Sequence, residues 1–366
     1  MAKPTKNKQA ENFLNDLHGK FDIVRKWKRE SISTGVLALD QATSKGGMPR
    51  GLVIDLYGDE GLGKTTLVLA MMAERVRCGE ICAFIDVEHG LQPGLVLSII
   101  PDTFLDKEGN VRHKDGLFHI YQPGNPSGEE TFKLVDRLLK EPAVRMIAVD
   151  SIAALAFAED LEEDKYTSPI GLQARRIGAF TRRILGIVYE FGTLVLFVNQ
   201  MRLSPNPHGP LLKTSTGGKA IRFYAALRIN MTAEEKIMRQ DVMIGQRVKL
   251  KLEKNKIGIP QRHTSISIMY GRGVDRARDL IDTGLEMGMI VQSGGWYKLN
   301  WGKQEITGHG EADLCEKIGP HLDAMRTQVH QQITEKATKD DILPPVADDA
   351  EVEAEAEVKP EPEAPK

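Results

Sequence analysis

A glycine-rich run at residues 58–65, GDEGLGKT, carries the residue types that bind phosphate. An apolar run, LVIDLY, precedes it, and a helical pattern, TTLVLAMMAERV, begins at its end. At such a strand-to-helix turn, backbone N–H groups and the positive end of the helix dipole attract phosphate oxygens. Lys64 can reach the terminal phosphates, and the Thr65 hydroxyl can bind Mg²⁺. The predicted nucleotide site comprises Gly58, Asp59, Glu60, Gly61, Leu62, Gly63, Lys64, Thr65 and Thr66. A glycine-rich turn that binds nothing is the alternative.

Two further carboxylates stand at the ends of apolar runs. Asp150 closes MIAVD at 146–150, and Glu88 closes ICAFIDVE at 81–88. Beside a phosphate site, a strand-end aspartate holds the magnesium shell, so Thr65 and Asp150 are the predicted metal ligands. Glu88 can orient and deprotonate a water that attacks a phosphoryl group. The alternatives are a solvated strand-end carboxylate for Asp150 and a cap of the next helix for Glu88.

A layered α/β core must position these groups. Apolar runs at 52–58, 81–88, 146–150 and 194–200 alternate with helical patterns at 64–78, 129–140 and 171–190. Runs of this kind predict a mainly parallel sheet covered on both faces, with ligands at the carboxyl ends of the strands. Segments 247–256 and 264–270 alternate in polarity, as half-exposed antiparallel strands do.

Composition divides the chain into four parts. Residues 1–30, with a helical pattern at 7–18, are predicted to form an N-terminal arm for oligomerisation, and residues 31–275 are predicted to form the core that carries the phosphate site. Residues 276–338 form a small α+β domain that ends in a helix over roughly 321–338. Residues 340–366 contain ten carboxylates, two lysines, five prolines and no aromatic residue. Such a segment cannot bury enough apolar surface to fold, so 339–366 is predicted to be a disordered acidic tail.

Bulk composition narrows the class of protein. The 366 residues are 41% hydrophobic and 27% charged, which is typical of a globular chain. The net charge is only −2, so any contact with nucleic acid must come from local clusters of cations. No stretch approaches the roughly 20 apolar residues that span a bilayer, and Cys78, Cys82 and Cys315 fit no metal motif. These features predict a cytoplasmic protein with reduced thiols and no membrane partner.

Six segments resemble the bacterial and phage RecA family. They are SISTG at 31–35, CAFIDVEHG at 82–90, VDSIAAL at 149–155, FVNQMR at 197–202, TGGKAIRFYAALR at 216–228 and KNKI at 254–257. Each is weak alone, but together they are highly specific, and the likeness runs from about Ser31 to Tyr297. The resemblance implies a RecA-like P-loop core and a DNA-dependent ATPase that uses ATP and Mg²⁺.

The resemblance also implies roles for residues outside the phosphate loop. It makes Glu88 the residue that activates water and Gln200 the sensor that links the nucleotide to a DNA-binding loop. A strand-end amide can bond a γ-phosphate and lose that bond on hydrolysis, although a purely structural amide is the alternative. The remaining residues it assigns are Lys254 and Lys256 on the phosphates of a neighbouring subunit, Phe223 in that interface and Tyr270 against the adenine.

Two loops and the helix between them are the expected DNA contacts. The loops span about 157–170 and 202–218, and the second is too long and too rich in Pro and Gly for a simple connection. Helix 171–190 carries two arginine pairs, 175–176 and 182–183, on one side, as a stripe along a phosphate backbone or as a solvated face. The predicted DNA contacts are Arg175, Arg182, Arg202, Lys213, Gly217, Gly218, Lys219, Arg247 and Lys249.

Some positions depart from the family pattern. The second loop has no aromatic residue to stack between bases, and the first contains five carboxylates between 159 and 164. Gln92 stands where the family often has an aspartate near adenine, and Thr232 stands where many members have an arginine for a second DNA strand. Arg247 and Lys249 are then the remaining candidates for that second strand.

The resemblance implies a recombinase of DNA repair and the SOS response. Such a protein coats single-stranded DNA as an open helical homo-oligomer and exchanges strands with homologous duplex DNA. Two rivals use the same core: a ring-shaped DNA motor, and a nucleotide-switched scaffold that binds DNA without exchanging strands. Glu88 favours real hydrolysis over a pure switch, and open helices formed with ATP and DNA would exclude the ring.

Overall fold

The computed structural model describes residues 30–125, 127–158, 172–204, 212–215, 218–302 and 304–340. For 202–204, 212–215, 218–219, 339 and 340 it describes the backbone alone. The predicted N-terminal helix, most of the first loop, and residues 341–366 of the predicted tail lie outside the described residues. No helix within these ranges is long and apolar enough to cross a membrane.

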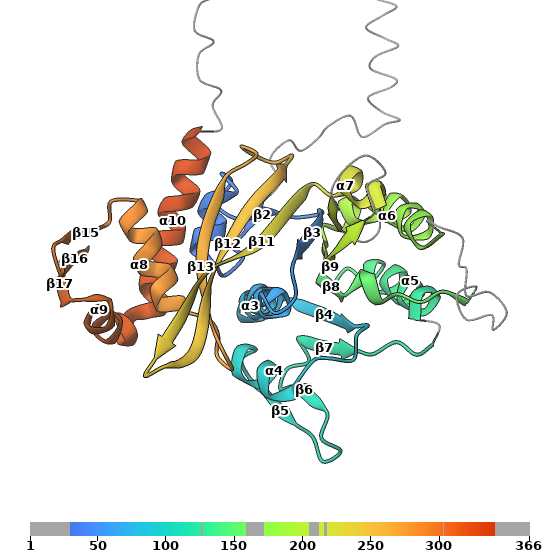
Figure 1. Ribbon diagram of the computed structural model, residues 1–366, viewed down its shortest axis with the longest axis horizontal. Coiled ribbons are helices and arrows are strands. Elements are labelled where there is room, and N and C mark those ends of the chain that lie inside the picture. The colour runs from blue at the N-terminus through green and yellow to red at the C-terminus, as the bar shows by residue number, and fades with distance from the viewer. Residues whose placement is uncertain are drawn as a thin grey trace, which may run out of the picture.

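A ten-stranded mixed sheet forms the centre of the molecule (Figure 1). Its parallel part consists of β3 (Val53–Gly58), β4 (Ile81–Asp86), β7 (Phe118–Tyr121), β8 (Val144–Asp150), β9 (Leu194–Ser204) and β11 (Leu227–Arg239). Antiparallel strands β12 (Val242–Asn255), β13 (His263–Met269) and β14 (Gly273–Val274) extend one edge, and β10 (Leu212–Ser215) pairs with β9. The order is β14-β13-β12-β11-β3-β9-β8-β4-β7.

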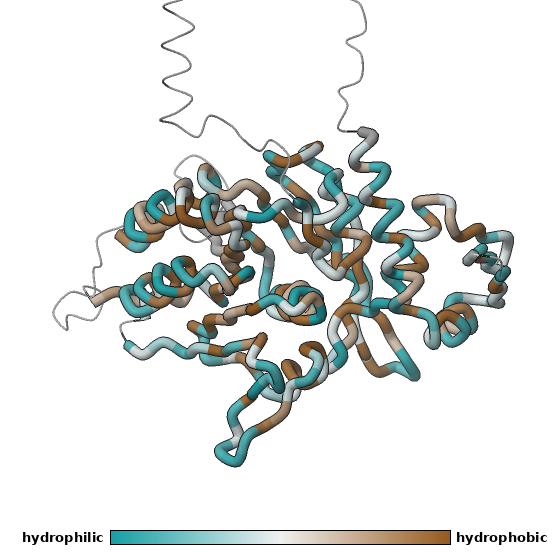
Figure 2. The backbone as a smooth tube through the Cα atoms, turned by 180° about the vertical axis from the view of Figure 1, so that it is seen from behind, coloured by the Kyte–Doolittle hydropathy of each residue, from teal (hydrophilic) through white to brown (hydrophobic). Residues whose placement is uncertain are grey.

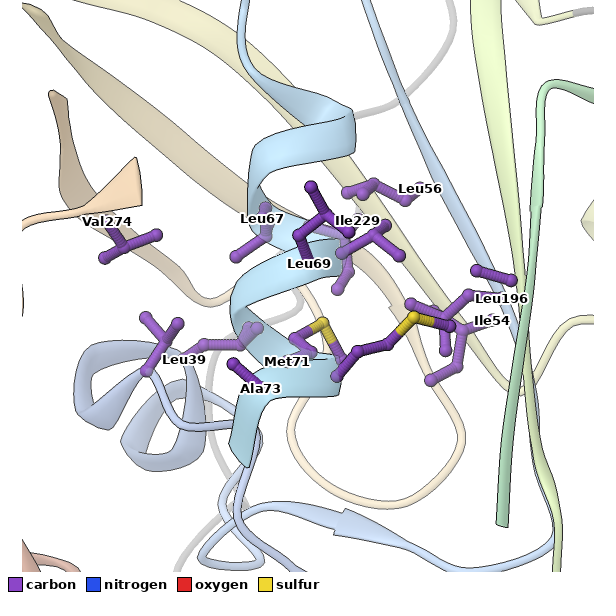
Figure 3. Packing of buried hydrophobic residues seen from close by; sticks show 14 of the residues in the cluster. Leu39, Ile54, Leu56, Leu67, Leu69, Met71, Ala73, Leu196, Ile229 and Val274 are labelled. Atoms are coloured by element: carbon purple, nitrogen blue, oxygen red, sulfur yellow. The ribbon is translucent and has the colours of Figure 1, made fainter. Parts of the chain in front are cut away.

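Helices cover both faces of this sheet because its strands are apolar on both sides. Along β3, Ile54 and Leu56 join the core under α3 (Lys64–Arg77), whereas Val53 joins the core on the other face. Figure 3 shows Leu67, Leu69 and other α3 side chains against the first face. α2 (Leu37–Ala42) and α4 (Pro93–Ile99) complete that layer.

The second face is covered by α5 (Ser127–Leu139), α6 (Leu172–Phe191) and α7 (Gly218–Tyr224). Hydrophilic and hydrophobic residues alternate along α5 and α6, as expected for helices with one buried side (Figure 2). Phe132 of α5 stacks on Phe180 of α6 at 3.9 Å between ring centroids, which fixes the two helices side by side. The sheet thus has the predicted layered α/β architecture, with helices on both faces.

A smaller mixed unit follows the sheet. It contains α8 (Arg276–Glu286), β15 (Ile290–Ser293), β16 (Trp296–Trp301), β17 (Gln304–His309), α9 (Glu311–Ile318), η3 (Gly319–His321) and α10 (Leu322–Asp340). Its apolar core includes Leu37 of α2, and α10 lies beside α2 (Figure 1). Asp279 of α8 accepts hydrogen bonds from the N–H groups of Leu37 (2.9 Å) and Ala38 (3.1 Å) and pairs with Arg326 at 2.9 Å. The small unit therefore holds the start of the core's own α2.

Three short pieces complete the described structure. β1 (Ser31–Ile32) pairs with β2 (Met48–Pro49), and η1 (Ile152–Ala154) follows β8. β5 (Thr103–Leu105) and β6 (Val111–His113) form a hairpin that projects from the edge of the molecule (Figure 1). Neither this hairpin nor the 13-residue strand β11 is indicated by the sequence patterns above.

Candidate nucleotide site

A cavity of about 620 Å³ opens at the carboxyl ends of the parallel strands. It lies where ligands bind in open α/β sheets, beside the turn from β3 to α3. Ten of the predicted residues line it: Glu60, Gly61, Gly63, Lys64, Thr65, Thr66, Glu88, Asp150, Gln200 and Tyr270. These residues come from the start of α3, from four parallel strands and one antiparallel strand, or from the turns that follow those strands. The fold therefore brings together residues that are far apart in the sequence.

The phosphate loop adopts a backbone conformation with positive φ angles at two of its glycines. Gly61 and Gly63 have φ angles of +74° and +80°, a region that disfavours other residues. A Cβ on Gly63 would also lie 2.7 Å from Cδ1 of Ile268, so this position requires glycine on two counts. Leu62 points into the apolar core, and Gly58 and Asp59 are not among the residues that line the cavity.

Lys64 begins α3 and is only 8% exposed. Its Nζ donates to the carbonyl oxygens of Gly58 (3.1 Å) and Asp59 (2.7 Å). Burial lowers the pKa of Lys64, while the carboxylates of Asp150 and Glu88 oppose that shift. The ammonium group is therefore held over the loop, where it can meet an anion with little movement.

Thr65 and Asp150 meet as the predicted metal pair. The Thr65 hydroxyl donates to Oδ2 of Asp150 at 2.5 Å. Burial raises the pKa of Asp150 to about 6; the Thr65 hydrogen bond opposes this shift, and the negative charge of Glu88 adds to it. A hydroxyl and a carboxylate beside a lysine are the hard oxygen ligands that Mg²⁺ prefers when substrate phosphates complete its shell. The donor set and the cavity fit a nucleotide with Mg²⁺.

Glu88 projects into the cavity two residues beyond β4. Its carboxylate accepts hydrogen bonds from the Ser151 hydroxyl and from Nε2 of Gln200, the latter at 2.9 Å. Asp86 fixes the turn that follows, because its carboxylate accepts from the N–H groups of Gly90 and Leu91 at 3.2 Å each. The next helix, α4, has its N-cap at Gln92, so Glu88 is not a helix cap.

Two residues of the site are not among those predicted from the sequence, although Ser151 lies within the quoted segment at 149–155. Ser151 follows Asp150 and binds Glu88, as described above. Gln246 comes from β12, and its Nε2 donates to the carbonyl oxygen of Gly61 at 2.6 Å. Gln92 and Tyr270 line the cavity as well, and Tyr270 is half exposed. Gln246 therefore braces the phosphate loop from the antiparallel part of the sheet.

Lys254 and Lys256 converge, but they do not line this cavity. Nζ of Lys254 donates to the carbonyl oxygens of Arg222 (2.5 Å) and Phe223 (2.8 Å), and Nζ of Lys256 lies 3.5 Å from that of Phe223. These carbonyls belong to the last turn of α7, where the helix dipole favours cations. Burial lowers the pKa of Lys254 to about 8, and the positive charge of Lys256 adds to the effect. Phe223 itself is 67% exposed.

The arginine stripe on α6 divides into two kinds of residue. Arg176 pairs with Glu129 at 2.8 Å and Arg183 with Asp136 at 2.5 Å, both on α5. Arg175 and Arg182 are exposed on the outer face of α6. The pairing of the first two arginines is structural, and it leaves Arg175 and Arg182 facing solvent.

The structure describes the side chains of only two of the other predicted DNA contacts, Arg247 and Lys249. Arg247 pairs with Asp282 (2.7 Å) and Glu234 (3.4 Å), and Lys249 of β12 is half-buried opposite Thr232. Arg202 lies on β9, Lys213 on β10, and Gly218 and Lys219 begin α7, but their side chains are outside the described structure, as is the whole of Gly217.

Comparison with known proteins identifies the family of the chain. The family described as the RecA N-terminal domain matches residues 15–275. The chain is 36% identical over 319 residues to Protein RecA of Helicobacter hepaticus, a match that covers 87% of each chain. It is 35% identical over 340 residues to Protein RecA of Gluconacetobacter polyoxogenes, which covers 91% of this chain and 92% of that protein. The chain therefore belongs to the RecA family, the DNA-dependent ATPases that act in recombination and repair.

Proposed function

We propose that the cavity is the ATPase site of a recombinase that forms helical filaments on single-stranded DNA and pairs it with homologous duplex DNA. The observation that carries this proposal is the convergence of Lys64, the Thr65 and Asp150 pair, Glu88 and Gln200 on one cavity. A plain glycine-rich turn would need none of these four groups beside it.

Each group has a role in the hydrolysis of ATP. Lys64 and the backbone of the phosphate loop hold the terminal phosphates, and Thr65 and Asp150 hold Mg²⁺, which neutralises charge on the phosphate oxygens. Glu88 accepts the proton of the attacking water, and Ser151 and Gln200 orient its carboxylate by their hydrogen bonds. Gln200 also senses the γ-phosphate, because its amide N–H can transfer its hydrogen bond from Glu88 to a phosphate oxygen.

Lys254, Lys256 and Phe223 form the surface that meets the next subunit, and we call this surface the lysine edge. None of the three lines the cavity of its own chain, and Phe223 is exposed, which supports this role. An interface of this head-to-tail kind generates an open helix when its rotation does not close. Tyr270 packs against the base, and Arg175 and Arg182 lie along the DNA phosphates. The protein acts in the cytoplasm.

A test of this function combines two assays on one preparation. ATP hydrolysis is expected to rise at least about tenfold with single-stranded DNA, followed by strand exchange with a homologous duplex under the same conditions. Stimulated hydrolysis without strand exchange would favour the DNA-binding scaffold. Closed rings instead of open helices under negative-stain microscopy would favour the motor.

The pKa of Asp150 predicts a pH dependence for nucleotide binding. Below pH 6 a proton occupies the carboxylate and competes with Mg²⁺, since that pKa is raised to about 6. The affinity for Mg²⁺-nucleotide is expected to fall about tenfold from pH 8 to pH 5 because of this group. Titrations of Asp150→Asn across the same range isolate its contribution, because the pH dependence of the nucleotide's own phosphates remains. Parallel profiles for the two proteins would contradict the assignment.

A further inference from the structure

A buried polar network crosses three neighbouring strands between the cavity and the lysine edge. Oδ1 of Asn199 accepts from the N–H of Gln200 at 2.9 Å, and Nδ2 of Asn199 donates to Oδ1 of Asp55 at 3.3 Å. Oδ2 of Asp55 accepts from Nε of Arg228 at 2.8 Å. The bonds therefore pass from β9 to β3 to β11 without a gap.

This network lies in the interior of the sheet, where removing a polar or charged group from water costs free energy. Asp55 and Asn199 are 0% exposed and Arg228 is 7% exposed. The guanidinium of Arg228 also lies 4.3 Å from the ring centroid of Tyr57 and 3.6 Å from a carboxylate oxygen of Glu253. A buried ion pair contributes little to stability compared with apolar residues of the same volume. Packing of the sheet alone therefore does not account for its presence.

Both ends of the network reach groups that the proposed function uses. At one end Gln200 bonds to Glu88 in the cavity. At the other end Arg228 stands opposite Lys254 in the pairing of β11 with β12, and its charge acts on Lys254. Lys254 in turn is bound to the last turn of α7, beside the exposed Phe223.

We propose that Asn199, Asp55 and Arg228 are positioning residues that transmit the state of Gln200 across the sheet to the edge that bears Lys254 and Lys256. A displacement of Gln200 toward a phosphate pulls on Asn199 through the Gln200 N–H and changes the bond to Asp55. Arg228 follows its carboxylate partner, and the lysine edge follows Arg228. The proposal rests on the sensor role of Gln200 in the proposed function.

The rival explanation is that the three side chains only fix the register of β9, β3 and β11. A structural residue of that kind changes the stability of the fold, but it does not change how strongly nucleotide and DNA binding depend on each other. The quantity that separates the two explanations is thus the ratio of DNA affinities with a non-hydrolysable ATP analogue and with ADP, since this ratio measures coupling between sites.

The experiment compares full-length variants that remove the link at Asn199. Asn199→Leu keeps the volume of the side chain and Asn199→Ala shortens it; both remove the two hydrogen bonds. Thr193→Val is the matched control, because Thr193 is also 0% exposed, immediately precedes β9 and donates one hydrogen bond, to the carbonyl oxygen of Val144 at 3.1 Å. Affinity for a single-stranded oligonucleotide is measured with each nucleotide, alongside the thermal unfolding midpoint.

Both Asn199 variants are expected to lower the affinity ratio at least about tenfold, whereas Thr193→Val changes it less than about twofold. Asn199 variants that keep the ratio, or that fail to fold where Thr193→Val folds, overturn the relay and leave Asn199 a structural residue. Gln200→Ala separates this failure from that of the proposed function. If Gln200→Ala leaves the affinity ratio unchanged, the sensor role of Gln200 is wrong. If Gln200→Ala lowers the ratio and the Asn199 variants do not, only the relay is wrong.

Discussion

A Glu88→Gln protein is expected to bind ATP with nearly unchanged affinity and to hydrolyse it at least about a hundredfold more slowly. The amide preserves the shape of the side chain and can still accept hydrogen bonds from Ser151 and Gln200, but it cannot take a proton from water. Filaments on single-stranded DNA should then persist, because release depends on hydrolysis. Steady-state hydrolysis, nucleotide titration and filament lifetime are the measurements.

Glu74→Gln provides the matched control for this variant. Glu74 lies on α3 and makes an exposed contact with Arg77 at 3.4 Å, outside the cavity, so the same chemical change should leave hydrolysis unaltered. DNA-stimulated turnover at the normal rate in Glu88→Gln would show that another group activates the water. Loss of nucleotide binding would place Glu88 in binding instead of catalysis.

Two inactive proteins are expected to rescue each other if the active site is shared between subunits. Lys64→Ala removes the phosphate-loop lysine, and Lys254→Ala/Lys256→Ala removes the lysines of the edge; each protein alone should be nearly inactive. In a randomly mixed open filament, about a quarter of the interfaces would pair an intact phosphate loop with intact edge lysines. Hydrolysis should therefore rise to a similar fraction of the normal rate, measured over a series of mixing ratios.

The triple variant Lys64→Ala/Lys254→Ala/Lys256→Ala supplies the negative control. Mixed with either parent, it cannot create an interface that has both parts intact, so no rescue should occur. Fluorescence transfer between labelled subunits verifies that the mixed proteins assemble together on DNA. If the two parents share filaments and still hydrolyse no more ATP than each does alone, the lysines act within their own subunit.

The elements predicted from the sequence are those specified by neighbouring residues. Continuous apolar strands, the helices between them and the strand-to-helix turn at 58–64 are local patterns, and each is found within a few residues of the expected place. The projecting β5 and β6 hairpin is not indicated, because its two three-residue strands are too short to show a period. β11 is not indicated either, and its outer part, after Met231, is largely exposed.

In the site as well, residues of local sequence motifs were predicted, whereas residues that depend on contacts between distant parts of the chain were not. Lys64 and Thr65 belong to one motif, and Asp150 and Glu88 follow apolar strands, so the parallel topology was enough to bring them together. Gln246 binds the phosphate loop from 185 residues away, and Arg228 binds Asp55 from 173 residues away. Those contacts depend on where β11 and β12 join the sheet, which no motif of one sequence specifies.

The contact between Asp279 and α2 limits the modularity of the chain. The family match ends at residue 275, but the carboxylate that holds the first N–H groups of α2 comes four residues later. Arg326 of α10 then binds that carboxylate and also the carbonyl oxygen of Gly35, so both ends of the described chain meet at one helix terminus. A chimera that exchanges the C-terminal segment with a relative must therefore carry over an acidic residue of the same reach. The C-terminal segment and α2 therefore form one structural unit, although the family match ends between them.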